Sequence, residues 1–151
     1  NLIMVGELFT DEHLKEMISH PDFSLGVDGY TSTDHGALSE VTSSQHPYCG
    51  HIEYLAHHVR ELGTLTLETA IHKMTKKVAD RFNIQKRGEI KEGNFADLVL
   101  FNADPVDSRS TIAKPQVYPD GITAVIVNGE IVVHNGVHKG KRPGQVIRRT
   151  A

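Results

Sequence analysis

The stretch ITAVIVNGEIVVHNG, residues 122–136, carries the clearest local structural signal in the sequence. It contains two runs rich in β-branched residues, joined by Asn128-Gly129. Asn-Gly supplies the positive φ angles of a type I′ turn, and the twist of that turn suits two antiparallel strands. The pattern therefore predicts a β-hairpin and marks the C-terminal part of the chain as β-rich.

The sequence before this hairpin changes character near residue 85. After that point, a Gly-containing turn and the apolar run Ala96–Phe101 predict one more strand. Before it, helical spacing predicts a helix over about 50–62 and a second helix that begins after the N-cap Thr66 and breaks near Thr75. The predicted buried faces of these two helices contain Ile52, Leu55, Ala56, Val59 and Leu62, and then Leu67, Ala70, Ile71, Met74, Val78 and Phe82.

The N-terminal residues predict an alternation of strand, helix and strand. Residues 1–9 are apolar and read as a buried strand. A helix begins after the N-cap Thr10, has acidic residues in its first turn and ends at Pro21. The segment FSLGV, residues 23–27, follows as a short strand, so the alternation favours a parallel α/β arrangement.

Composition excludes several classes of protein. The chain has 151 residues and a formal net charge of -3, which argues against a dedicated nucleic-acid binder. The basic segment HKGKRPGQVIRR near the C-terminus reads as a solvated tail. No apolar run approaches the roughly 20 residues of a membrane span. The single cysteine, Cys49, excludes an internal disulfide and favours a reducing compartment such as the cytoplasm.

Asp28 is the first candidate for a functional residue. It follows the apolar residues Leu25 and Val27 and precedes Gly29, which lets the backbone turn sharply. A carboxylate just past the end of a strand lies on the face where active sites gather in α/β folds. The structural alternative, an Asx-turn or a cap, is common for Asp before a loop and stays open at this level.

The histidines and the cysteine form the second set of candidates. His35, His46 and His51 share a long loop and helix start with Cys49, and zinc accepts these residue types. The spacing matches none of HExxH, CxxC or a close HxH pair. A Cys49/His nucleophilic pair is conceivable, but an incidental cysteine is the commoner outcome. The sequence contains no GxSxG nucleophile elbow and neither of the phosphate-binding motifs GxxxxGK[ST] and GxGxxG.

Several segments in order resemble the C-terminal third of the N-acyl-D-amino-acid deacylases (D-aminoacylases), in the metal-dependent amidohydrolase superfamily. The segments are LGVDGY (25–30), HPYCG (46–50), LTLETAIHKMTKKVADRFNIQKRGEIKEGNFADLVLFN (65–102) and DGITAVIVNGEIVVHNGVHKGKRPGQVIRR (120–149). The resemblance implies an α/β fold in which residues 1–86 form the last units of a (β/α)8 barrel. Residues 87–151 then supply part of a small β-sandwich.

The resemblance also implies a metal site to which this chain contributes one group. Asp28 carries over as the aspartate that ends the last barrel strand, binds the metal, deprotonates a metal-activated water and passes the proton to the leaving nitrogen. The cofactor implied is zinc, as one or two ions whose other ligands lie outside this chain. His46 and Tyr48 are expected to bind substrate.

The sequence departs from the family pattern at the rim of the expected site. Tyr48 replaces the arginine that follows His-Pro in the family, Val27 replaces a serine, and His46 lies eighteen positions after Asp28. A tyrosine supplies no positive charge for a substrate carboxylate. The resemblance implies hydrolysis of N-acyl (D-)amino acids or related amides, and the missing arginine leaves D-amino-acid specificity open, with a cyclic amide as an alternative substrate.

Two readings without catalysis by this chain remain open. In one, the chain is a catalytically silent piece that completes a barrel with the remainder from another chain or from an N-terminal part. In the other, a weaker alternative, it is a self-contained β-rich binding module with a helical lead.

Overall fold

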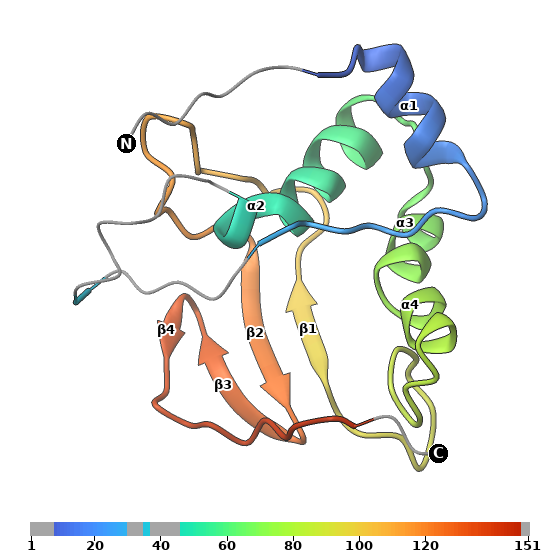
Figure 1. Cartoon of the computed structure of the whole chain (residues 1–151). Coiled ribbons are helices and arrows are strands. Elements are labelled where there is room, and N and C mark those ends of the chain that lie inside the picture. Colours follow the sequence, from blue (N-terminus) through green and yellow to red (C-terminus); the bar gives the residue numbers. More distant parts are fainter. Residues whose placement is uncertain (1–7, 30–34, 37–45, 149–151) are drawn as a thin grey trace.

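The chain forms a helical part that packs beside a four-stranded sheet, as shown by the computed structural model in Figure 1. The structure describes residues 8–29, 35–36 and 46–148. Most of the predicted strand over 1–9 and most of the long loop between Asp28 and His46 therefore lie outside the described residues. The described elements are α1 (Asp11–Ser19), α2 (His46–Glu53), the π-helix η2 (Tyr54–Glu61), α3 (Leu67–Met74), α4 (Lys76–Arg81), β1 (Leu98–Phe101), β2 (Ile122–Val127), β3 (Glu130–His134) and β4 (Val137–His138).

Helix α1 forms where its capping residues predict it. The Thr10 side chain accepts a hydrogen bond from the His13 amide at 3.3 Å, which satisfies one of the free donors at the helix start. The helix ends at Ser19, two residues before Pro21, whose ring is incompatible with a helix interior. Its apolar face is half-buried rather than fully buried.

The predicted strand over residues 23–27 is wrong for the described part of the chain. These residues run without regular secondary structure and pair with no described strand. A strand needs a hydrogen-bonded neighbour, and apolar alternation by itself does not provide one. Leu25 and Val27 are half-buried because they pack against the helices instead. The described sheet is entirely antiparallel, so a parallel arrangement is not observed.

The helix predicted over 50–62 begins earlier and changes pitch. It starts at His46 as α2 and continues as the π-helix η2, which ends with a bond from the Leu62 amide to the His57 carbonyl at 2.9 Å. Leu55 is buried as predicted, but Leu62 is 50% exposed. The wider π turn has more residues per turn than the assumed 3.6, so Leu62 is rotated off the buried face.

Helices α3 and α4 confirm the predicted cap and break. The Thr66 side chain accepts from the Thr69 amide at 3.3 Å, and Thr75 leaves the helical region with φ -125° and ψ -91°. The Thr75 hydroxyl donates to the Ile71 carbonyl at 2.7 Å, which competes with the regular helical pattern. Phe82 is 69% exposed, so its predicted place on the buried face is wrong.

The sheet confirms the predicted strand and hairpin. Its order is β1-β2-β3-β4, with each strand antiparallel to the next. Asn128 and Gly129 have φ angles of 47° and 82°, as a type I′ turn requires. Ala124, at the centre of β2, is only 5% exposed.

Buried residues of the helices contact the first strand of the sheet. Tyr54, Leu55 and Ala70 form a buried apolar cluster, and Phe101 of β1 packs against it. Arg60 at the end of η2 adds a polar link, because its guanidinium donates to the carbonyls of Asp104 and Val106 after β1. None of the described helices combines the length and the apolar character needed to cross a bilayer.

Candidate functional site

Asp28 lies at the end of the extended segment that crosses the start of α2. Its φ angle is 50°, in the left-handed region that Asp tolerates better than most residues. Asp28 is exposed, and its carboxylate makes no hydrogen bond or ion pair with a described residue. An Asx-turn or cap would require such a bond, so the geometry does not favour the structural alternative.

Two glycines fix the position of this segment against α2. A side chain at position 29 would place its Cβ 3.2 Å from the Pro47 Cα. A Cβ at Gly50 would lie 2.5 Å from a methyl group of Val27. Both contacts allow the segment and the helix to approach closely, and they hold Asp28 next to the first turn of α2.

His46 and Tyr48 belong to that first turn and not to the loop in which the sequence placed them. Pro47 between them suits a first helical turn, where its missing N–H leaves no hydrogen bond unmade. His46 is exposed, whereas Tyr48 is only 9% exposed. The Tyr48 ring meets the Tyr118 ring edge-on, with the two ring centroids 5.5 Å apart. The buried Tyr48 hydroxyl has no hydrogen-bond partner among the described residues.

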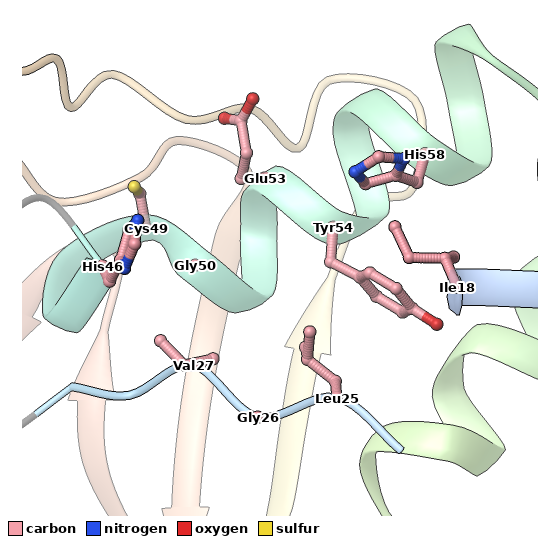
Figure 2. A pocket seen from close by; sticks show the side chains of 10 residues that line it. All are labelled: Ile18, Leu25, Gly26, Val27, His46, Cys49, Gly50, Glu53, Tyr54 and His58. Carbon is pink, nitrogen blue, oxygen red and sulfur yellow. The ribbon is translucent and has the colours of Figure 1, made fainter. Parts of the chain in front are cut away.

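A cavity of about 200 Å³ lies between residues 25–27 and the helix, as Figure 2 shows. His46 lines this cavity, but Asp28 and Tyr48 do not. The complete lining consists of Ile18, Leu25, Gly26, Val27, His46, Cys49, Gly50, Glu53, Tyr54 and His58. The three residues predicted as a site therefore lie around one helix start without converging on this cavity.

Sequence reasoning missed the cavity residues Glu53, Tyr54 and His58. A signal was present, because residues separated by three or four positions along a helix share one face. Gly50, Tyr54 and His58 follow that spacing from His46. The same spacing is also typical of an ordinary buried helix face, so it does not single out a site.

His58 is a cavity residue whose pKa is lowered. Burial is the main cause that lowers its pKa from 6.5, the neighbouring His57 lowers it further, and Glu53 and Asp11 oppose the shift. Its Nδ1 atom is buried and has no hydrogen-bond partner among the described residues. The ring is therefore neutral near pH 7, since burial disfavours the charged imidazolium.

The predicted His and Cys candidates do not assemble into a metal centre. Across residues 8–29, 35–36 and 46–148, no group of three His, Cys, Asp or Glu side chains could hold a metal ion. Figure 2 shows Cys49 and Glu53 on the side of α2 that faces away from Leu25 and Val27. Cys49 is only 2% exposed, which places its thiol out of reach of a substrate and disfavours a nucleophilic role.

Comparison with known proteins identifies the family. The model of the amidohydrolase family matches residues 11–133, which is most of the chain. The chain belongs to the amidohydrolase family. Membership accounts for the ordered resemblance across the described helices and sheet.

Several relatives of this amidohydrolase chain are N-acyl-D-amino acid deacylases. The N-acyl-D-aspartate deacylase of Alcaligenes xylosoxydans xylosoxydans is 35% identical over 146 residues, covering 93% of this chain and 27% of the relative. A D-aminoacylase structure, from work on its binuclear metal centre, aligns with a TM-score of 0.83 and 28% identity over 93% of this chain. A third relative is the N-acyl-D-glutamate deacylase from Bordetella bronchiseptica, solved with zinc and a phosphonate inhibitor that mimics the tetrahedral intermediate. Its structure aligns with a TM-score of 0.80 and 32% identity over 93% of this chain.

The alignments cover only part of each relative. The chain spans 28% of the length of both aligned structures. The mixed fold of helices and an antiparallel sheet thus corresponds to one portion of a deacylase.

Proposed function

We propose that this chain contributes the catalytic aspartate, Asp28, to an enzyme that hydrolyses the amide bond of N-acyl amino acids or related amides. The carrying observation is the position of Asp28. It is exposed, makes no bond to a described residue and is held beside α2 within the segment that matches the amidohydrolase family. In this proposal, residues 1–86 are the last units of a (β/α)8 barrel and residues 87–151 belong to the small β-sandwich.

Asp28 has the chemistry that amide hydrolysis needs. Its carboxylate accepts a proton from the attacking water at Oδ, and the resulting acid donates that proton to the amide nitrogen as the C–N bond breaks. An amine is a poor leaving group unless it is protonated, so the same group serves both steps. An exposed carboxylate in an open position can reach both the water and the nitrogen.

The residues present do not form a metal site by themselves. The described part of the chain supplies no set of three ligands, so Asp28 provides at most one of them. We propose zinc, as one or two ions, because the aligned deacylase structures are described with zinc or with a binuclear metal centre. The remaining ligands then come from outside this chain, either from a preceding part of the same protein or from a separate chain.

His46 and Tyr48 are the proposed substrate contacts. Both lie in the first turn of α2, on either side of Pro47, and Pro47 contacts Gly29, the residue that follows Asp28. Tyr48 brings no positive charge to the site, and its hydroxyl is buried beside Tyr118 without a hydrogen-bond partner among the described residues. This favours recognition of an amide or a neutral group over tight pairing with a carboxylate.

The decisive experiment replaces Asp28 by Asn in the full-length protein. We expect a loss of roughly 10²–10⁴-fold in kcat/KM, the usual contribution of general acid–base catalysis. Metal content measured by mass spectrometry should be largely retained. Glu92→Gln is the matched control, because Glu92 is an exposed acid in a loop of the sheet part. Full activity of Asp28→Asn would remove Asp28 from the mechanism.

A second candidate function is structural. The described residues hold no complete metal site, and the edge strand β1 exposes Val99 and Leu100 by 55% and 59%. Both observations fit a catalytically silent piece that completes a barrel carried by another chain. Mixing this chain with a separately produced N-terminal part tests this candidate. Co-elution together with hydrolysis that persists when this chain carries Asp28→Asn supports it, and a complete lack of association rules it out.

A further inference from the structure

Two Asn-Gly pairs occupy the two tight turns of the sheet. Asn128-Gly129 joins β2 to β3, and Asn135-Gly136 joins β3 to β4. The φ angles are 47° and 82° in the first turn and 49° and 74° in the second. The dipeptide and the local backbone are therefore the same, and any chemical difference between the turns comes from their surroundings.

The first turn is held by the rest of the fold. The Asn128 side-chain oxygen accepts from the Arg87 guanidinium at 3.0 Å, and its side-chain nitrogen donates to the Pro143 carbonyl at 2.6 Å. The Gly129 amide donates to the Ala96 carbonyl at 3.0 Å. Both ends of the asparagine amide and the following backbone nitrogen are thus engaged, which opposes rotation of either group.

The second turn has a free side chain. Asn135 and Gly136 are both exposed. The Asn135 backbone amide donates to the Thr123 carbonyl at 2.8 Å. Within residues 46–148, no hydrogen bond engages the Asn135 side chain or the Gly136 amide. The side-chain carbon and the following nitrogen can therefore approach one another.

We propose that Asn135 is a site of spontaneous covalent modification, and that Asn128 is protected from the same reaction. The Gly136 backbone nitrogen loses its proton and attacks the side-chain carbonyl carbon of Asn135. A five-membered succinimide forms, and the side-chain nitrogen leaves as ammonia after gaining a proton. Water then opens the ring at either carbonyl, which gives aspartate or isoaspartate. Glycine at the second position permits the attack because no Cβ shields its nitrogen.

The modification would act on a small and defined part of the sheet. Isoaspartate inserts one extra carbon into the main chain of the β3–β4 turn, and a type I′ turn cannot absorb that change. Strand β4 has only two residues, which pair with Val133 and His134. Loss of that pairing leaves β1, β2 and β3 joined, and the modified turn is remote in sequence from Asp28.

The test is a time course on the full chain in mildly alkaline buffer. Peptides that contain Asn135 and Asn128 are quantified by mass spectrometry, which detects the replacement of an amide by an acid. In the folded chain we expect conversion at Asn135 to be about tenfold faster or more, because each hydrogen bond at Asn128 must break before attack. In concentrated urea we expect similar rates at both positions.

Two variants and three outcomes complete the experiment. Asn135→Gly keeps a residue suited to positive φ and should abolish the fast phase. Arg87→Lys removes the guanidinium fork at Asn128 and should accelerate conversion there. Equal rates in the folded chain, faster conversion at Asn128, or conversion of both positions only in urea would each overturn the proposal.

Discussion

The helical part and the sheet part of this chain are stabilised in different ways. In the sheet, every strand pairs with the next one in the chain, and a two-residue turn closes each of the last two hairpins. In the helical part, the segment over 23–28 has no hydrogen-bonded partner strand among the described residues. It depends on distant contacts, such as the packing of Leu25 against the cluster of Tyr54, Leu55 and Ala70 and the close approach of Val27 to Gly50. Local pairing makes a region self-sufficient, whereas distant contacts make it dependent on the whole fold.

The largest expected effect is at Gly121, which starts the central hairpin of the sheet part. Gly121→Ala would place a Cβ 2.6 Å from the Val106 Cα at a φ of 83°. The Val106 backbone cannot shift without a large energetic cost, so we expect a loss of about 3 kcal/mol or more in the free energy of unfolding. Urea denaturation followed by circular dichroism measures this change.

Gly140→Ala is the matched control for that substitution. Gly140 has a φ of 71°, but nothing lies within 4 Å of its Cβ position. This variant isolates the conformational cost, about 1 kcal/mol. If both variants lose equal stability, the close contact with Val106 contributes nothing, and the sheet part is less tightly packed than we describe.

A smaller effect is expected at Lys73, which ties α3 to the end of α1. Its ammonium donates to the carbonyls of Ile18 and His20, the latter at 2.6 Å, and the residue is only 4% exposed. Lys73→Met removes the ammonium donor from both carbonyls, and His20 keeps only the Phe23 amide at 3.3 Å, so we expect a loss of about 2 kcal/mol. Hydrogen exchange should accelerate in α1 and not in β2.

Lys15→Met serves as the control, because Lys15 is exposed on α1. We expect it to change stability by less than about 0.5 kcal/mol. A uniform increase in exchange across both parts after Lys73→Met would show that they unfold together and would erase the distinction between them.

The smallest effect concerns the pH dependence of the helical part. Burial lowers the pKa of His58 below 6.5, so the unfolded chain binds a proton more readily than the folded one. Stability should therefore fall as the pH drops below about 6.5 and level off below the lowered pKa. His58→Gln should reduce the pH dependence of the free energy of unfolding below about pH 6.5. An unchanged profile would mean that another group controls it.

The sequence predicts most of the sheet because the signals there are local. Asn128-Gly129 defines a turn by its own φ angles, and the strands on either side pair through that turn. Thr10 and Thr66 are likewise capping residues that act within three positions, and both helices begin where predicted. Such short-range interactions need no knowledge of the remaining fold.

The candidate site is less predictable because its geometry depends on residues far apart in the chain. Leu25 and Val27 have the alternation of a strand, but pairing requires a partner that the pattern does not specify. The start of α2 was missed because HPYCG contains Pro and Gly, which usually indicate a loop. The contact of Gly29 with Pro47 places Asp28 beside His46, and no sequence rule predicts that contact.

The π-helix η2 makes this chain sensitive to its exact length between Tyr54 and Arg60. Each residue added to or removed from an α-helix rotates everything after it by about 100°, and the rotation in the wider π-helix is smaller but still large. Deletion of one residue from η2 would turn the Arg60 guanidinium away from the carbonyls of Asp104 and Val106, although every side chain type in the contact remained. Insertions and deletions in this helix are therefore expected to be tolerated far less than substitutions on its exposed face.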